Sequence, residues 1–232
     1  MKDFFSWERL WANLPKLISK LPITFEIVGL SFVLGGVLAM LLACVCIKRI
    51  PVLHQLTGLF ISFERGTPLL VQMLVVYYAL PLMLEGAFGI STRGWGKILF
   101  VDIALILNEG AFLSETFRAS ILSIPAGQRE AALASGLSEG TAFFRIVLPQ
   151  AIRTALPATG INLIGLFQDS SLVFMIGVID IVGRAQAIGT ATNHSLEAYI
   201  IVGITFVSIS LLLGLLSHHI NRRFTYRSRE AA

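Results

Sequence analysis

Long apolar segments alternate with shorter polar intervals along most of the chain. An α-helix rises about 1.5 Å per residue, so about 20 apolar residues cross the hydrocarbon core of a bilayer. The segments are continuously apolar rather than alternating, which indicates helices and not the strands of a closed barrel. The segments of suitable length are residues 24–47, 69–88, 98–121, 158–178 and 197–217. The pattern therefore predicts an all-α, polytopic membrane protein with five transmembrane helices.

A shorter apolar helix precedes the second of these spans. Residues 52–63 are largely apolar. Residues 64–68 then interrupt the apolar pattern, because they contain the charged Glu64 and Arg65 as well as Gly66 and Pro68. Proline lacks the N–H that a helical hydrogen bond needs, so a bend at this point has a local cause. We predict a helix that rises from the membrane surface, bends near residues 66–68 and then crosses the membrane.

The first 22 residues show helical periodicity. One face carries Phe4, Trp7, Trp11, Leu14, Ile18 and Leu21, and the other carries Glu8, Arg9, Asn13, Lys16 and Lys20. A helix with tryptophans on its apolar face and charges on the other is typical of the membrane interface. We predict an interfacial amphipathic helix here, and the periodicity argues against the alternative of a disordered tail.

Residues 123–157 form the longest polar, charge-bearing interval between apolar segments. Residues 126–135 are good helix formers, and Gly136 follows where a left-handed residue ends a helix. Ser138 can cap a second short helix, which we expect to end before Pro149. Two short helices between spans suit a surface that another protein grips. The alternative is an amphipathic hairpin that packs only against this protein's own bundle.

This interval contains a spaced motif. It consists of Glu130-Ala131-Ala132, then Gly136 after three residues, and Ile146-x-Leu148-Pro149 after nine more. The motif resembles the EAA loop of the membrane subunits of ABC importers, whose coupling helix docks in a groove on the ATPase subunit. The resemblance implies a cytoplasmic coupling-helix loop that contacts an ATPase through Glu130, Ala131, Ala132, Gly136 and Leu137. Small alanines permit close approach, glycine permits the turn, and the glutamate offers a carboxylate to donors.

Further segments resemble the polar amino-acid branch of these permeases, which includes cystine-type members. They are Arg65-Gly66-Thr67-Pro68-Leu69-Leu70-Val71-Gln72, Tyr77-Tyr78, Pro81, Ile124-Pro125, Gln128, Asp169-Ser170-Ser171-Leu172 and Ile176-Gly177. The resemblance covers roughly residues 23–223 and implies a five-span core used as a pair, two ATPase subunits and an extracytoplasmic binding protein. Members commonly have a lysine where this chain has Gln168, so a role for that lysine does not carry over.

Polar groups at membrane depth are costly and are candidates for function. The candidates for a substrate path are Gln72, Asn108, Glu109, Gln168 and Asp169. The alternative is hydrogen bonding or pairing between helices, which we favour for Glu115 with Arg118 three residues later. For Asn108, Glu109 and Asp169 both interpretations stay open.

The composition agrees with a membrane protein. The 232 residues are 55% hydrophobic and 14% charged, and the mean hydropathy is +0.79. The formal net charge of +4 reflects basic residues at the cytoplasmic ends of spans rather than nucleic-acid binding. Most of the 18 lysines and arginines fall on the side of the central loop and the C-terminus. We therefore predict a multi-pass protein of the bacterial plasma (inner) membrane, with the N-terminus outside and the C-terminus cytoplasmic.

The chain shows no pattern for catalysis, metal binding or nucleotide binding. Cys44 and Cys46 share one apolar span, His218 and His219 are adjacent, and no glycine loop of the Walker type is present. We expect no catalytic residue, no metal and no cofactor. Energy would then come from a partner, which is the role that the resemblance gives to the ATPase.

These observations predict a single permease domain at residues 23–220, an interfacial segment at 1–22 and a basic cytoplasmic tail at 221–232. The predicted function is that of a non-catalytic permease subunit of an ATP-driven ABC importer for a polar amino acid. Its partners would be an ATPase dimer, a second permease subunit, a binding protein and the bilayer. The alternatives are an ion-coupled secondary transporter with Glu109 or Asp169 as a proton site, and a non-transporting scaffold or sensor. The sequence selects neither the amino acid nor an identical or paralogous second permease.

Overall fold

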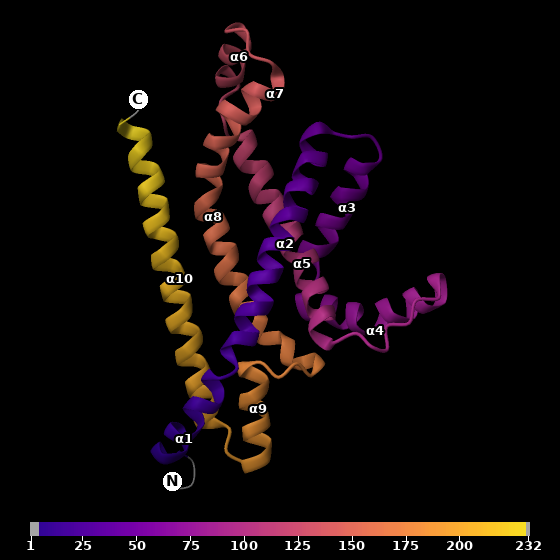
Figure 1. Ribbon diagram of the computed structural model, residues 1–232, viewed down its shortest axis with the longest axis vertical. Helices are drawn as coiled ribbons and strands as arrows, with labels where there is room; N and C mark the ends of the chain where they lie inside the picture. Colours follow the sequence, from indigo (N-terminus) through magenta and orange to yellow (C-terminus); the bar gives the residue numbers. More distant parts are fainter. Residues whose placement is uncertain (1–4, 231–232) are drawn as a thin grey trace.

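The computed structural model describes the backbone of residues 5–230 and the side chains of residues 5–223. The described residues form helices and contain no strand, which confirms the all-α fold. Long helices make an elongated bundle, with α1 and the end of α10 at its opposite ends (Figure 1). The helices are α1 (Trp7–Ile18), α2 (Leu21–Lys48), α3 (Leu53–Gly66), α4 (Leu69–Phe88), α5 (Lys97–Leu122), α6 (Ala126–Ala134), α7 (Glu139–Ala142), a π-helix (Phe143–Val147), α8 (Leu148–Asp169), a 3₁₀-helix (Ser170–Ile176), α9 (Ile181–Thr192) and α10 (Leu196–Glu230).

Helices α2 and α5 form the centre of the bundle and pack closely against each other. Glycines allow this approach: a Cβ atom on Gly35 would lie 3.0 Å from the Cβ of Glu109, and one on Gly110 would lie 2.6 Å from the Cδ2 of Leu38. Small residues at such contacts are the usual means of packing helices within a membrane, where burial of apolar surface contributes little. The core around this contact consists of Ile27, Val28, Met73, Val101, Ala104, Leu105, Leu166, Phe167, Val173, Ile176 and Val178.

Four helical segments of the described chain are long and apolar enough to cross a membrane: Leu21–Lys48, Leu69–Phe88, Glu139–Ile176 and Leu196–Arg223. The remaining expected span corresponds to α5, which has 26 residues. Asp102, Glu109, Glu115 and Arg118 are spread along it, so no long stretch of α5 is apolar. The count of five spans therefore stays a prediction.

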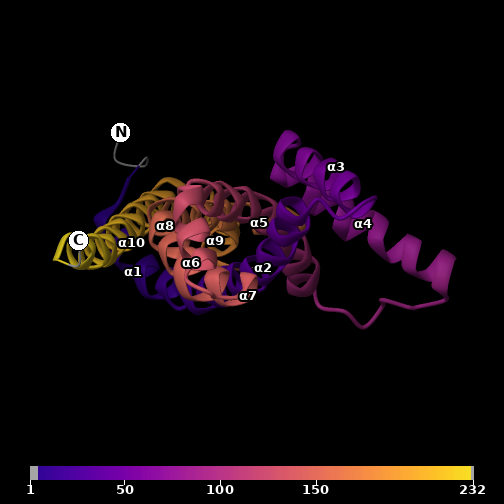
Figure 2. The ribbon, with the colours of Figure 1, turned by 90° about the horizontal axis from the view of Figure 1, so that it is seen from above.

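The chain breaks between α3 and α4, as expected from Pro68. Thr67 has an extended backbone, with φ −119° and ψ 148°. α4 is long and apolar enough to be a span, as expected, and it projects sideways from the bundle (Figures 1 and 2). Only Gln72 and Met73 of α4 are buried. Since this chain covers so little of α4, its own packing does not hold α4 alongside α2 and α5.

The expected end of a helix before Pro149 is wrong. The chain stays helical from Glu139 through the π-helix into α8, so the fourth span begins well before residue 158. An α-helix would bring the proline ring against the carbonyl of the residue four positions earlier. The wider π turn at Phe143–Val147 precedes Pro149, which lies in the first turn of α8, where a missing N–H is tolerated.

The expected N-terminal helix is present as α1, capped by Ser6. It lies against α10 and α9. Leu17 is fully buried there, whereas Trp7 and Trp11 are 68% and 64% exposed. The tryptophans thus point away from the protein, as a helix in the membrane interface requires, and that location stays a prediction. Phe4 of the expected apolar face lies outside the described residues.

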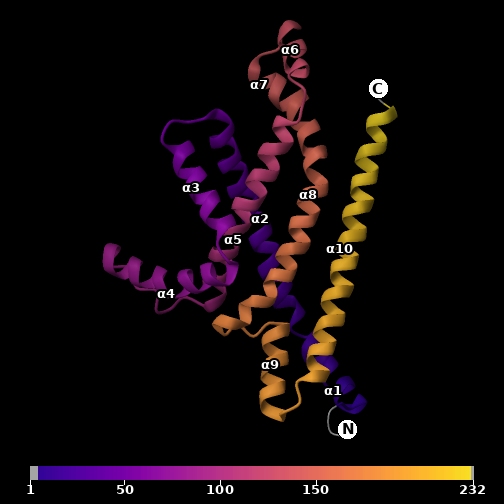
Figure 3. The same cartoon turned by 180° about the vertical axis from the view of Figure 1, so that it is seen from behind.

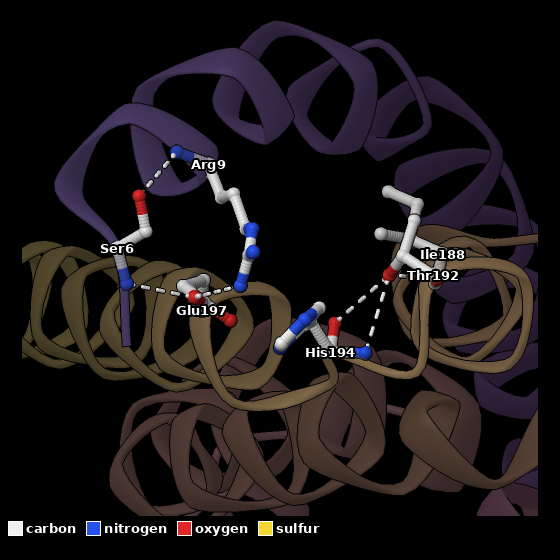
Figure 4. Close-up of polar contacts among 6 residues, drawn as sticks. All are labelled: Ser6, Arg9, Ile188, Thr192, His194 and Glu197. Carbon is white, nitrogen blue, oxygen red and sulfur yellow. Dashed lines mark hydrogen bonds and ion pairs between the residues drawn. The ribbon is translucent and has the colours of Figure 1, made fainter. Parts of the chain in front are cut away.

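A buried carboxylate fastens α1 to the start of α10. Glu197 accepts a hydrogen bond from the backbone N–H of Ser6 at 2.9 Å, and its carboxylate lies 3.9 Å from a guanidinium nitrogen of Arg9. Figure 4 shows both contacts beside the turn that joins α9 to α10. Between the 3₁₀-helix and α10 lies α9, which Asp180 caps by accepting a 2.8 Å hydrogen bond from the Gly183 N–H. α10 continues through the segment expected as a basic tail as far as Glu230.

Candidate functional site

The hairpin of α6 and α7 projects from one end of the bundle, beyond the turn that joins α2 to α3 (Figures 1 and 3). It lies at the end of the bundle where α10 finishes, and α1 lies at the opposite end. We call residues 126–142 the coupling hairpin. The structure agrees with the expectation of a short helix at α6 outside the candidate spans, whereas α7 is the beginning of the continuous helix that runs into α8.

Gly136 shapes the coupling hairpin. Its φ angle is +84°, in the left-handed region that residues with a Cβ avoid. The backbone N–H of Gly136 donates to the Leu133 carbonyl at 2.9 Å, and that of Leu137 donates to the Ala132 carbonyl at 3.2 Å. These bonds satisfy carbonyls that the end of α6 would otherwise leave without partners. The predicted helix end at Gly136 is confirmed.

An ion pair that the sequence analysis missed closes the hairpin. The Arg129 guanidinium donates to the Glu139 carboxylate through two hydrogen bonds, one of them 2.9 Å from Nε to Oε2. These bonds raise the pKa of Arg129 above its ordinary value. Opposite charges on either side of a predicted glycine turn were the available signal. The bidentate geometry fixes the angle between α6 and α7 more firmly than a single contact would.

The five residues expected to couple to an ATPase divide into two groups. Glu130, Ala131 and Gly136 are exposed, and none of the described side chains forms an ion pair with Glu130. Ala132 is 7% exposed and Leu137 is half-buried, so these two pack within the chain itself. Of the five residues, Glu130, Ala131 and Gly136 are therefore the ones that lie on the surface of the chain.

The candidates for a substrate path also divide. The amide of Asn108 donates to the Gln72 side-chain oxygen at 2.9 Å. The Gln72 amide in turn donates to the carbonyl of Glu64 at 2.7 Å and to the Thr67 hydroxyl at 2.8 Å. These buried groups link α5 to the break between α3 and α4 and satisfy a carbonyl at the end of α3. Gln72 and Asn108 thus stabilise the break between α3 and α4. These contacts correspond to the alternative interpretation, in which polar groups within the spans form hydrogen bonds between helices.

Glu109, Gln168 and Asp169 do not take part in the hydrogen bonds at the break between α3 and α4. Glu109 is buried, and its Oε1 atom has no partner among the described residues. Asp169 is the last residue of α8. Asp169 and Gln168 are exposed in this single chain, and the Gln168 amide lies 3.5 Å from the Ser210 hydroxyl of α10. Among these three candidates, Glu109 therefore has the buried oxygen that lacks a partner within the described part of the chain.

Glu115 and Arg118 form the pair that their spacing predicted. The guanidinium donates to both carboxylate oxygens, at 3.0 and 2.7 Å. Each group supplies the counter-charge of the other. The expectation of pairing is confirmed for Glu115.

Residues 15–226 match the family of the binding-protein-dependent transport system inner membrane component. The match covers most of the chain, and the protein belongs to this family of membrane subunits of transport systems. The resemblance to the permeases of ABC importers is thereby confirmed.

Individual relatives narrow the class further. The L-cystine transport system permease protein TcyL of Bacillus subtilis (strain 168) is 40% identical over 212 residues, which are 91% of this chain and 88% of that protein. The probable amino-acid permease protein YxeN of the same strain is 36% identical over 210 residues, which are 90% and 92% of the two chains. The crystal structure of an amino acid ABC transporter with histidines has a TM-score of 0.83 at 28% identity and covers 94% of this chain and 99% of its own.

Proposed function

We propose that this chain is the permease subunit of an ATP-driven ABC importer for a polar amino acid. The observation that carries the proposal is the coupling hairpin, which projects beyond the spans and exposes Glu130 at the position of the EAA motif. The similarity to TcyL and to the amino-acid transporter structure supports the class of solute. Family membership favours ATP as the energy source over an ion gradient.

The hairpin is connected to two long helices, which gives it mechanical leverage. α5 enters it through residues 123–125, and α7 leaves it without a break through the π-helix into α8. When ATP closes the partner ATPases, a pull on α6 would tilt α5 and α8 together and open the paired bundles outward. Hydrolysis would restore the inward-facing state. Coupling of this kind is reciprocal, so solute delivery also favours closure of the ATPases.

The partners follow from this mechanism. Two ATPase subunits would bind the coupling hairpins of two permease chains in the plasma membrane. The second permease would cover the exposed apolar side of α4, where Val75, Tyr78, Leu82 and Met83 are exposed. An extracytoplasmic binding protein would deliver the solute at the end that carries α1 and α9. In this proposal the N-terminus is outside and the C-terminus is in the cytoplasm.

Glu109 and Asp169 are the proposed contacts for the amino group of the solute. Glu109 has a buried oxygen without a partner among the described residues, and the Gln168 amide, which contacts the Ser210 hydroxyl at 3.5 Å, would be near enough to Asp169 to meet the solute carboxylate. The amides of Gln72 and Asn108 are already bonded to each other and to the break between α3 and α4. They would therefore support the path rather than bind the solute.

Transport driven by ATP alone tests this function. The complete transporter would be reconstituted in vesicles with its binding protein, with protonophore and cation ionophores present. We expect ATP to drive accumulation of a polar amino acid from a panel that includes L-cystine, and a non-hydrolysable analogue to drive none. Uptake that the ionophores abolish and ATP does not restore would instead assign the chain to the ion-coupled transporters.

A further inference from the structure

A cationic cleft lies between α2, α3 and α5, at the end of the bundle that carries the coupling hairpin. Its volume is about 700 Å³. The polar side chains that line it are Arg49 at the end of α2, His54, Ser62 and Arg65 on α3, and Glu115 and Arg118 on α5. It is separate from Glu109 and Asp169, and the proposed function does not use it.

The cleft holds more positive than negative charge. Arg118 is neutralised by its bidentate pair with Glu115. Arg65 has no carboxylate within ion-pair distance among the described residues, although its charge acts on Glu115. Its guanidinium carbon lies 5.4 Å from the centroid of the Phe112 ring. Arg49 pairs with no described carboxylate, so a cleft with one carboxylate carries three guanidinium groups.

The backbone at the rim of the cleft is unusual. Arg49 has a φ of +48° and a ψ of 45°, in the left-handed region, and Val52 combines a positive φ of +65° with a ψ of −54°. A β-branched residue rarely adopts such an angle, and strain of this kind is typical of segments that hold a ligand or a switch. Arg49 of this turn is one of the residues that line the cleft.

The arginines of the cleft, its position between helices and the apolar outer side of α3 together indicate the class of ligand. Arginine forks match phosphate oxygens, and basic pockets between membrane helices at the bilayer surface bind lipid head groups. The outer side of α3 exposes Leu56, Leu59 and Phe63, with exposed fractions of 59%, 70% and 51%, which suits contact with hydrocarbon. We propose that this cleft binds the phosphate head group of an anionic phospholipid from the leaflet on the side of the coupling hairpin. Arg49 and Arg65 bind the phosphate, and Arg118 stays with Glu115.

Lipid retention by the complete transporter tests the proposal. The purified assembly would be exchanged into mixed micelles of phosphatidylglycerol and phosphatidylcholine, and native mass spectrometry would measure the lipids that stay bound. The variant Arg49→Gln with Arg65→Gln removes the two unpaired charges. The control Arg93→Gln with Lys97→Gln removes two charges at the opposite end of the bundle. A third variant, Arg49→Lys with Arg65→Lys, keeps the positive charges but removes the guanidinium groups that can donate two hydrogen bonds to one phosphate.

We expect the parent protein and the control to retain phosphatidylglycerol in preference to phosphatidylcholine. The double glutamine variant should lose about tenfold in phosphatidylglycerol affinity, since each basic group near a membrane surface contributes appreciably. The lysine variant should fall between them. Unchanged retention in the glutamine variant would overturn the proposal. Displacement of the lipid by millimolar glycerol phosphate would assign the cleft to a soluble anion. A photo-cross-link to the second permease from a labelled Ser62→Cys, in a chain with Cys44 and Cys46 replaced by alanine, would assign it to the subunit interface. Either result overturns the lipid site without bearing on ATP-driven uptake.

Discussion

Substitution of Gly136 by valine is expected to detach the ATPase from an otherwise inserted permease. The φ angle of +84° places a β-branched residue in a region that costs about 1–3 kcal/mol. α6 would then end differently, and the hydrogen bonds from Gly136 and Leu137 to the last turn would be lost. Because nothing lies within 4 Å of a Cβ at this position, the effect is on backbone conformation and not on packing of the spans.

Co-purification of the ATPase with tagged permease measures this effect. We expect the amount of bound ATPase to fall about tenfold, as a penalty of about 1.4 kcal/mol implies, with the permease yield in membranes unchanged. Gly136→Asn is the matched control, since asparagine tolerates the left-handed region and should retain the ATPase. Equal retention by the valine and asparagine variants would show that the turn is not needed for assembly.

Substitution of Gly35 by valine is expected to destabilise the permease itself. A Cβ there would lie 3.0 Å from the Glu109 Cβ and 3.3 Å from the Gly110 backbone nitrogen. The backbone atom cannot move aside without separating α2 from α5, so overpacking should cost about 1–3 kcal/mol. The neighbouring Gly36 has nothing within 4 Å of the same atom, which makes Gly36→Val a control in the same turn of the helix.

Thermal unfolding of the detergent-solubilised transporter distinguishes the two variants. Gly35→Val should lower the midpoint by several degrees relative to the parent and reduce the yield of monodisperse protein. Gly36→Val should leave both close to the parent values. Equal losses in the two variants would mean that the close contact of α2 with α5 does not govern stability.

Local features of the fold could be predicted from the sequence because their causes are local. The end of α6 at Gly136, the break at Pro68 and the pair of Glu115 with Arg118 each depend on residues a few positions apart. The helix end expected before Pro149 was wrong because a π turn, which has no sequence signal of comparable strength, absorbs the proline. The sideways course of α4 depends on what packs against it, which its own apolar pattern does not specify.

The candidate residues for a substrate path also depend on tertiary contacts that the sequence does not specify. Polarity at membrane depth selected Gln72, Asn108 and Glu109, which the structure buries, together with Gln168 and Asp169, which are exposed. Their role in a substrate path stays a prediction. Polarity could not show that Asn108 and Gln72 are bonded to each other, because they are 36 residues apart and meet only when α5 packs against the base of α4. The contact of Arg129 with Glu139 spans ten residues and likewise depends on how the hairpin closes.

The most direct measurement of the central claim is site-specific cross-linking from position 130 in the assembled transporter. A chain with Cys44 and Cys46 replaced by alanine would carry Glu130→Cys labelled with a photoreactive group, and a second such chain would carry Arg93→Cys at the opposite end. Position 130 should yield an adduct with the mass of permease plus ATPase, and position 93 should yield none with the ATPase. An adduct of position 130 with the extracytoplasmic binding protein, or no ATPase adduct from it at all, would contradict the account.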